Sequence, residues 1–470
     1  MLEYFEPLKN DGVRQVNRAR VMRFIQDKEG IDRTELASLI CVSNAAITNI
    51  VNELIAADIV QETISSGDSS ARGRKRIGLQ INRSGGFVLG ITAIATNVSI
   101  VLANICGEVV DEIESLAIDR LKKVFNASWT NVQPHSGAQA NTAVFMACLK
   151  PGDKILGLDL SMGGHLTHGS PANFSGKNYQ AFFYGVDRET GLVDYNQLEA
   201  VARQEKPKMI ICGASAYSRD WDYKRIRAVA DEIGALVLAD IAHPAGLIAA
   251  GLLNDPLEHC HIVTSTTHKT LRGPRGGIIM MRDDFDNPMG VKDPKGNIRS
   301  MSALLDLAVF PGMQGGPIMS AVAGKAIALA ECATPAYQKY AKDVIVNAQS
   351  LCTALEAEGM RAVSGGTQTH LALIDIRSTG VNGKVADERC GAAGIVLNKN
   401  SIPYDPEAPS VTSGIRVGTP ATTTQGMGVD EMKTIASLIS RAIKTDDASA
   451  HAAIKSDVHA LTARFPIYQA

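Results

Sequence analysis

Lys269 is the residue of this chain whose type and setting most directly indicate covalent chemistry. It stands in STTHKTLRGPRGG, directly after an apolar run and among hydroxyl groups and glycines. A lysine in such a place can form a Schiff base with an aldehyde, and nearby cations would keep part of its amine deprotonated. The alternative is an ordinary surface lysine, which is the usual place for this residue type. The surroundings favour the chemical interpretation.

Asp240 supplies a second group of matching chemistry. It lies at the end of the apolar run in GALVLADIAH, and His243 follows three residues later. A carboxylate at a strand end can face a site, and pyridoxal phosphate needs an acid against its pyridine nitrogen so that the ring can draw electrons from a carbanion. Alone, each residue would be structural. An aspartate that ends one strand and a lysine that follows the next predict a pyridoxal-phosphate site.

Anion-binding groups are also present in the sequence. HSGAQAN places Ser136 and Gly137 just before a helical stretch, where free backbone N–H groups and the helix dipole favour a phosphate, although capping alone would explain them. The loop PGMQGGP (311–317) is a second backbone-rich anion site or simply a turn. Arg416, in TSGIRVGTP, could bind a carboxylate through two parallel hydrogen bonds, with a structural salt bridge as the alternative.

The elements that must position these residues are predicted by apolar runs that alternate with helical stretches from Asp111 onward. This alternation is typical of an α/β fold with a mainly parallel sheet, which binds ligands at the carboxyl ends of its strands. The predicted strands are KILGLDL, PKMIICGAS, GALVLADIAH, HIVTSTT and GGIIMM. Beyond Thr334 a long helical stretch and short strands such as LALIDI predict a second, smaller α+β domain.

From about Cys106 to Ala470 the chain resembles serine hydroxymethyltransferase in the order and spacing of nine motifs. These are NVQPHSGAQAN, LDLSMGGHLTHGSP, GASAYSRDWDY, LADIAHPAGLIAAG, TSTTHKTLRGPRGG, VFPGMQGGP, VSGGTQTH, NKNSIP and TSGIRVGTPA. The resemblance implies a type I, aspartate aminotransferase-like fold, with a pyridoxal-phosphate-binding large domain over 106–333 and a small α+β domain over 334–470. It also implies a homodimer or homotetramer that transfers the hydroxymethyl carbon of serine to tetrahydrofolate and leaves glycine.

The same resemblance implies a role for each matching residue. The catalytic residues would be Lys269, which forms the Schiff base, Asp240, which pairs with the pyridine nitrogen, His165, which stacks on the ring, and His243. Further cofactor contacts would come from Ser136, Gly137 and His268 at the phosphate, from Ser215 and His243 near the phenolic oxygen, and from Gly315 and Gly316 of the partner subunit. Substrate contacts would come from Arg416 at the amino-acid carboxylate and from Leu160, Gly164, Leu166 and Asn400 at the folate. No metal is implied.

The first 84 residues have a different pattern. Helical periodicity runs from Val13 to about Gln26, a second helix begins near Arg33, and Ser43 is a plausible N-cap for a third. Two strand-like runs, IVQETI and RIGLQI, then flank the loop SSGDSSARGRK. This layout predicts a winged helix-turn-helix over 1–84. The run FVLGITAIATNVSIVLAN predicts two further β-strands, a hairpin over 85–105.

Residues 11–104 resemble the start of a ROK-family transcriptional repressor. The resemblance implies that 43–56 is a DNA recognition helix, that 85–105 is a remnant of a sensor domain, and that a basic wing enters a minor groove. The implied DNA contacts are Ser43, Asn44, Thr48, Arg72, Arg74, Lys75 and Arg76. A solvated loop is the alternative explanation of the basic run.

The two resemblances together leave three hypotheses. Upstream of Cys106 no motif matches the segment that carries a catalytic glutamate and interface helices in the hydroxymethyltransferase family, so an enzyme of impaired turnover is expected. The second hypothesis is a DNA-binding regulator with an inactive pyridoxal-phosphate body. The third is a non-functional chimera that cannot fold stably.

Composition narrows the class of protein further. The chain has 470 residues, enough for two or three domains, and its 45% apolar and 20% charged content is typical of a soluble globular protein. A formal net charge of −2 argues against DNA binding through overall charge but allows a local basic patch. Its eight cysteines form no CxxC pair, and no signal layout or membrane-length apolar run is present. These features predict a cytoplasmic protein.

Overall fold

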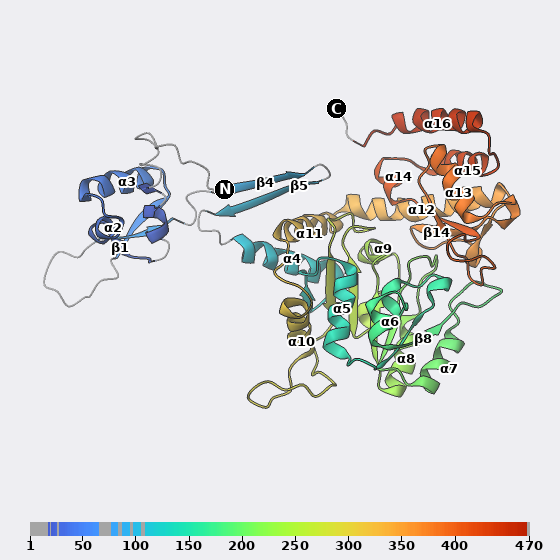
Figure 1. The fold of residues 1–470 in the computed structure, drawn as a ribbon, viewed down its shortest axis with the longest axis horizontal. Helices are drawn as coiled ribbons and strands as arrows, with labels where there is room; N and C mark the ends of the chain where they lie inside the picture. The colour runs from blue at the N-terminus through green and yellow to red at the C-terminus, as the bar shows by residue number, and fades with distance from the viewer. Residues whose placement is uncertain are drawn as a thin grey trace, which may run out of the picture. The chain divides into compact units, whose positions relative to one another are not determined.

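In the computed structural model the chain divides into two compact units, Met1–Ser115 and Leu116–Ala470 (Figure 1). The described residues are 17–18, 20–25, 28–64, 77–82, 87–94, 97–104 and 109–467. Four residues of the predicted basic wing (Arg72, Arg74, Lys75 and Arg76) and the predicted junction at Cys106 lie outside these ranges.

Two short helices form the centre of the first unit. Helix α2 (Arg33–Ile40) is capped by Asp32, whose carboxylate accepts the N–H groups of Thr34 and Glu35. Helix α3 (Asn44–Ala56) is capped by Ser43, as predicted, and the two helices are bent by 117° relative to each other. Such caps satisfy backbone donors that have no partner inside the helix.

Three short strands complete this part of the unit, in the order β1 (Ile31–Asp32), β3 (Ile77–Ile81), β2 (Val60–Ile64). All pairs are antiparallel, and Val60 lies opposite Ile81, so the two predicted runs do form a paired hairpin. The core buries Val21, Ile25, Leu36, Ile40, Ile47, Ile50, Val51, Leu54 and Leu79. The predicted pair β4 (Phe87–Ile94) and β5 (Asn97–Asn104) is also antiparallel. The winged-helix assignment itself stays a prediction.

The second unit is built on a seven-stranded sheet. Its order is β6 (Trp129–Asn131), β12 (Gly277–Met281), β11 (Ile262–Thr266), β10 (Leu236–Asp240), β9 (Met209–Cys212), β7 (Lys154–Leu158) and β8 (Gln180–Tyr184). Only β12 runs against the others, so the expectation of a mainly parallel sheet is confirmed. Strands β6 and β8 were not among the predicted strands, and β6, with three residues, is too short to display a repeat.

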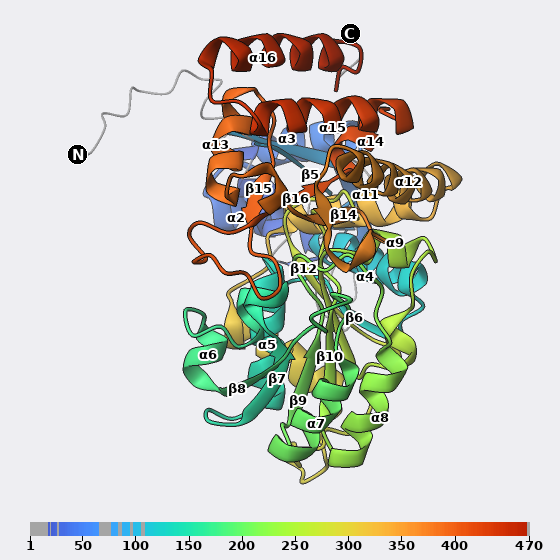
Figure 2. The ribbon, with the colours of Figure 1, turned by 90° about the vertical axis from the view of Figure 1, so that its right-hand side faces the viewer.

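Helices cover both faces of this sheet, which explains why its central strands are buried along their whole length. Every residue of β9, β10, β11 and β12 is buried. Helix α5 (Gly137–Cys148) packs Val144 and Phe145 against one face, and α8 (Tyr223–Ile233) lies on the opposite side (Figure 2). The polar strand ends are therefore brought to one edge of a rigid layer.

The C-terminal part, coloured orange to red in Figure 1, has a smaller antiparallel sheet of order β13 (Arg361–Ala362), β14 (Leu371–Asp375), β16 (Gly414–Gly418), β15 (Asn398–Asn400). Helices α12 (Pro335–Ala357) and α13 (Gly383–Ala392) pack on this sheet, α15 (Val429–Ile443) packs on both of them, and α16 (Ala448–Ala463) packs on α15 and α13. Strands and helices of the predicted α+β type are present here, while a domain boundary at 333/334 stays a prediction.

The remaining helices connect these layers. They are α4 (Val109–Phe125), α6 (Phe174–Asn178), α7 (Tyr195–Glu205), α9 (Ala245–Ala249), α10 (Met301–Leu307), α11 (Met319–Cys332) and α14 (Pro420–Thr424). Among the residues described, no single helix is long and apolar enough to cross a membrane, and only the bent pair α2–α3 passes that test of length and composition together.

Candidate active site

Asp240 and Lys269 meet at the carboxyl edge of the large sheet. Asp240 is the last residue of β10, and Lys269 follows the end of the adjacent parallel strand β11 by three residues. Burial lowers the pKa of Lys269, with Arg416 and Arg275 acting in the same direction and Asp240 opposing them. A larger fraction of the amine is therefore uncharged, which is the form that attacks an aldehyde.

The Asp240 carboxylate is buried, 8% exposed, and both of its oxygens accept hydrogen bonds. Its Oδ2 accepts from Asn141 Nδ2 at 2.8 Å and lies 3.1 Å from His168 Nε2, while its Oδ1 accepts the N–H of Ala242 at 3.0 Å. Burial alone would raise its pKa, but the bond and charge of His168, the charge of His165 and the Asn141 amide outweigh burial and hold the pKa well below the usual range. The group is therefore a fixed anion.

Asn141 and His168 also belong to the candidate site, although neither was predicted from the sequence. Asn141 lies on α5, and its Oδ1 accepts from the hydroxyl of Thr264 at 2.6 Å, which fixes the amide so that Nδ2 faces Asp240. His168 is buried in the turn after β7. The second histidine in MGGHLTHGSP was the available signal for His168, because two histidines three residues apart in a glycine-rich turn can share a face.

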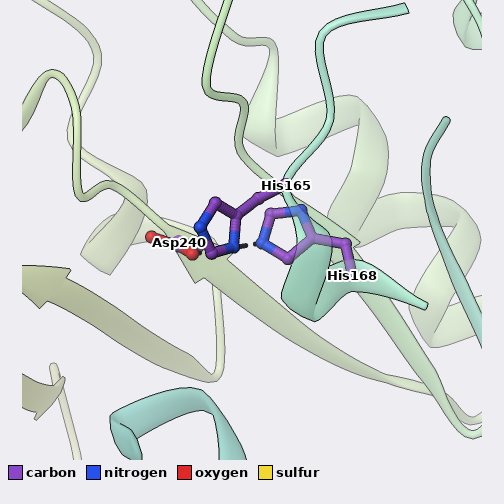
Figure 3. A group of neighbouring side chains, drawn as sticks. All are labelled: His165, His168 and Asp240. Carbon is purple, nitrogen blue, oxygen red and sulfur yellow. Dashed lines mark hydrogen bonds and ion pairs between the residues drawn. The ribbon is translucent and has the colours of Figure 1, made fainter. Parts of the chain in front are cut away.

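His165 lies beside His168, with ring centroids 5.5 Å apart (Figure 3). Its Nδ1 is 2.7 Å from the Thr167 hydroxyl, and burial lowers its pKa to about 4, with Asp240 opposing this shift. The ring is therefore neutral at pH 7, and a neutral ring can stack on a flat cofactor. Ligand atoms of His165, His168 and Asp240 lie within 4.8 Å of one another, a spacing that a metal ion could also use. Asp240 joins Asn141 and His168 through hydrogen bonds, while His168 Nδ1 is buried and has no hydrogen-bond partner among the described residues.

The residues of the predicted anion cradle lie at the start of α5. Ser136 is its N-cap, with Oγ accepting the N–H of Gln139 at 3.2 Å. A side chain at Gly137 would place its Cβ 2.7 Å from Thr266 Cγ2, so only glycine lets the helix start approach the end of β11. His268 Nδ1 is buried and has no hydrogen-bond partner among the described residues. A phosphate at the helix start fits these groups, because it would satisfy such a donor.

The glycine loop 311–317 contacts His135, the residue before Ser136. His135 Nε2 is 3.1 Å from the carbonyl oxygen of Gly316, and the backbone N–H of His135 donates to Gln314 Oε1 at 3.1 Å. A side chain at Gly315 or Gly316 would meet nothing within 4 Å, so packing within this chain does not require glycine there. The open space beside the two glycines would allow another molecule to approach closely. That Gly315 and Gly316 contribute to the active site of a partner subunit stays a prediction.

Arg416 and His243 come together at the small sheet. Arg416 Nη1 donates to the carbonyl of Ser215 at 2.7 Å, and no ion pair joins it to a carboxylate within the described part of the chain. His243 Nδ1 is 3.3 Å from His370 Nε2, and the two rings stack at 5.5 Å. Burial lowers the pKa of both histidines, that of His370 to about 3. Both rings are therefore neutral at pH 7, and Arg416 has no carboxylate partner among the described residues, so its guanidinium can bind one.

The four residues predicted to contact the folate differ in how exposed they are and in what they contact within the chain. Leu160 and Leu166 are exposed apolar side chains, at 45% and 48%. A Cβ at Gly164 would collide with the Leu158 carbonyl, so this glycine serves the turn itself. Asn400 is on the edge strand β15 and donates to the Ser401 carbonyl. The two leucines offer an apolar surface, and their contact with folate stays a prediction.

A lysine and a buried carboxylate at adjacent strand ends, with a capped helix start beside them, define a pyridoxal-phosphate-binding α/β protein. A family model described as serine hydroxymethyltransferase matches residues 105–439. The chain belongs to the serine hydroxymethyltransferase family. The family has the type I pyridoxal-phosphate fold and uses this cofactor, with serine and glycine as substrates and tetrahydrofolate as co-substrate, in an oligomeric assembly.

Proposed function

We propose that this chain binds pyridoxal phosphate through Lys269 and interconverts serine and glycine with tetrahydrofolate. The observation that carries the proposal is the pairing of Lys269 with the buried, hydrogen-bonded Asp240 at one sheet edge. The cofactor would supply an electron-withdrawing ring that stabilises negative charge at the substrate α-carbon. The protein supplies the position and the charges around it.

Each residue of the site has a separate task in this proposal. Asp240 holds a proton on the ring nitrogen, because a carboxylate kept ionised by its neighbours favours the protonated partner. His165 covers one face of the ring and excludes water. Arg416 orients the amino-acid carboxylate, and its guanidinium is free of carboxylate ion pairs in the described structure. Ser136 and His268 hold the phosphate.

Turnover is proposed to be reduced relative to the family. The family match begins at residue 105, and the residues before it carry none of the motifs of the segment that provides a catalytic glutamate in relatives. Loss of one general acid–base group typically lowers a rate about 10²–10⁴-fold. The direct experiment is a visible spectrum with added pyridoxal phosphate, followed by a serine-to-glycine assay. An unchanged cofactor spectrum after mixing would contradict the proposal.

Arg416→Lys is expected to raise the KM for serine at least about tenfold, because one ammonium cannot make two parallel bonds to a carboxylate. The same variant should leave the cofactor affinity within about twofold, since Arg416 is assigned to the substrate. Steady-state kinetics and a cofactor titration measure the two quantities. Arg389→Lys is a matched control, because Arg389 donates instead to the backbone carbonyl of Ile443. Equal KM values for the two variants would remove Arg416 from the substrate site.

A second candidate function, DNA binding, rests on the first unit. Ser43, Asn44, Asn49 and Asn52 of the α3 region are exposed, and amide side chains can read base edges in a major groove. The 117° bend between α2 and α3 is of the kind used by helix-turn-helix proteins. In this proposal the basic run 72–76 contacts phosphates.

The triple change Arg72→Ala, Arg74→Ala and Arg76→Ala is expected to flatten the dependence of DNA affinity on salt. Each lost phosphate contact lowers the slope of log K against log salt by about 0.9, so three contacts lower it by about 2.7. Fluorescence anisotropy on a random duplex at several salt concentrations measures this slope. Arg18, Arg20 and Arg23, changed together to Ala, provide a matched loss of charge outside the run. A slope that does not respond to the 72–76 changes would rule out a DNA-binding wing.

A further inference from the structure

Lys325, in the middle of α11, is among the most deeply buried charged side chains that the structure describes, with 1% of its surface exposed. Its Nζ donates to three backbone carbonyls, those of Val132 at 2.5 Å, Pro134 at 3.1 Å and Gly277 at 2.9 Å. An ammonium group has three donors, so these bonds use all of them. Burial of a lysine is costly, and such a complete set of bonds calls for a reason.

The three carbonyls belong to two segments that meet at the anion cradle. Val132 and Pro134 lie in the connection from β6 to α5, and Pro134 is two residues before Ser136. Gly277 is the first residue of β12, and its N–H also donates to the Pro134 carbonyl at 2.9 Å. The ammonium therefore ties the turn before the helix start to the neighbouring strand.

Two consecutive glycines make this close approach possible. A Cβ at Gly276 would collide with Lys325 Cε, and a Cβ at Gly277 would collide with the carbonyl oxygen of Ser136. The Gly276 carbonyl also accepts the N–H of Thr267 at 3.1 Å, in the turn that leads to Lys269. Hydrogen bonds thus connect the ammonium, through residues 276–277, to two segments. One holds the proposed phosphate-binding residue Ser136, and the other leads to Lys269, the proposed partner of the cofactor aldehyde.

We infer that Lys325 is a positioning residue that acts as a built-in monovalent cation and holds the phosphate cradle in its binding geometry. Without its charge, the Val132 and Gly277 carbonyls would lose this donor and the Pro134 carbonyl would keep the N–H of Gly277, so the turn before Ser136 would shift. The inference rests on the proposed function, because it assumes that Ser136, Gly137 and His268 bind the cofactor phosphate. It assigns to Lys325 a specific effect on phosphate recognition, beyond any contribution to stability.

The test compares pyridoxal phosphate with pyridoxal, which has the same ring and aldehyde but no phosphate. Dissociation constants for both are measured by fluorescence titration on the wild-type apoprotein and on Lys325→Met. The affinity ratio of pyridoxal phosphate to pyridoxal is expected to fall about tenfold or more in Lys325→Met, the effect of losing charge-assisted bonds at the cradle. Lys339→Met, at an exposed lysine of α12, is the control and should keep the wild-type ratio.

A purely structural role would weaken both ligands equally and leave the ratio unchanged, which would overturn the inference. A wild-type protein that binds neither ligand, or binds both equally, would instead overturn the proposed cofactor site itself. These two failures are therefore separable.

Chemical rescue gives an independent readout. In Lys325→Ala, methylammonium or K⁺ can enter the vacated space between the three carbonyls, and either cation is expected to restore part of the preference for pyridoxal phosphate. Tetramethylammonium has no N–H donor and a larger radius, so it should have no effect. If Lys325→Met does not fold, the same affinity ratio of pyridoxal phosphate to pyridoxal is measured on Lys325→Arg. It is expected to fall, because a guanidinium keeps the charge but cannot direct three N–H groups to this set of carbonyls. An unchanged ratio in that variant would contradict the inference.

Discussion

Lys269→Met is expected to abolish covalent attachment of pyridoxal phosphate and, at the same time, to make the apoprotein more stable. The first effect follows because the thioether cannot form a Schiff base, so turnover should fall to the background of the assay. The second follows because burial lowers the pKa of Lys269 from 10.5. A charged amine in this place costs free energy that a methionine does not.

The sign of the stability effect depends on pH. Below the lowered native pKa both states are protonated and the whole penalty is present, and it disappears as the pH rises to the unfolded value of 10.5. Thermal unfolding of wild type and variant should therefore differ most at neutral pH and converge in alkaline solution. Lys224→Met, on the exposed side of α8, is the control. A variant less stable than wild type at pH 7 would show that burial of the charged Lys269 amine does not destabilise the native state.

Asp240→Asn is expected to lower turnover roughly 10²–10³-fold, the usual cost of removing one fixed stabilising group from an active site. A neutral amide cannot keep the ring nitrogen protonated, and one of its orientations also turns a donor toward the donor of Asn141. Cofactor binding should weaken less than turnover, because Ser136, Gly137 and Lys269 are unchanged. Single-turnover assays and cofactor titration separate these effects.

The matched control for this variant is Asp222→Asn. Asp222 caps α8 through the N–H of Arg225, and asparagine caps helices about as well as aspartate, so neither activity nor stability should change. Comparable losses in both variants would mean that the effect of Asp240→Asn is global. Retention of full turnover in Asp240→Asn would contradict the assignment of the ring-nitrogen partner.

The strand ends and helix starts of the site were predictable because their signals are local. An apolar run marks a buried strand, and the residues after it lie at the sheet edge, so Asp240 was expected at the end of one strand and Lys269 shortly after the next, where the structure has them. The N-caps Ser43 and Ser136 were found in the same way, since a cap acts within three residues of its own position.

The hydrogen-bond partners of the site were not predictable from local patterns. His168 meets Asp240 across 72 residues, and Asn141 meets it across 99. Lys325 reaches Val132 across 193 residues. No periodicity encodes such pairings, because the helix and strand repeats specify only which face a side chain occupies. A single buried lysine or asparagine in the sequence is therefore indistinguishable from an exposed one until the layers are assembled.

One consequence of helix α5 concerns molecular length. Gly137, at its first turn, lies at the phosphate end of the proposed site, and Asn141 supports the carboxylate at the ring-nitrogen end. With a rise of about 1.5 Å per residue, the two positions are spaced along the axis by about 6 Å. In the proposed site one rigid helix thus fixes the distance between the phosphate-binding end and the ring-nitrogen end. An analogue whose phosphate arm is one carbon longer is therefore expected to lose either the phosphate contact or the contact with Asp240. Deleting one residue between them would rotate the amide by about 100° and uncouple the two ends.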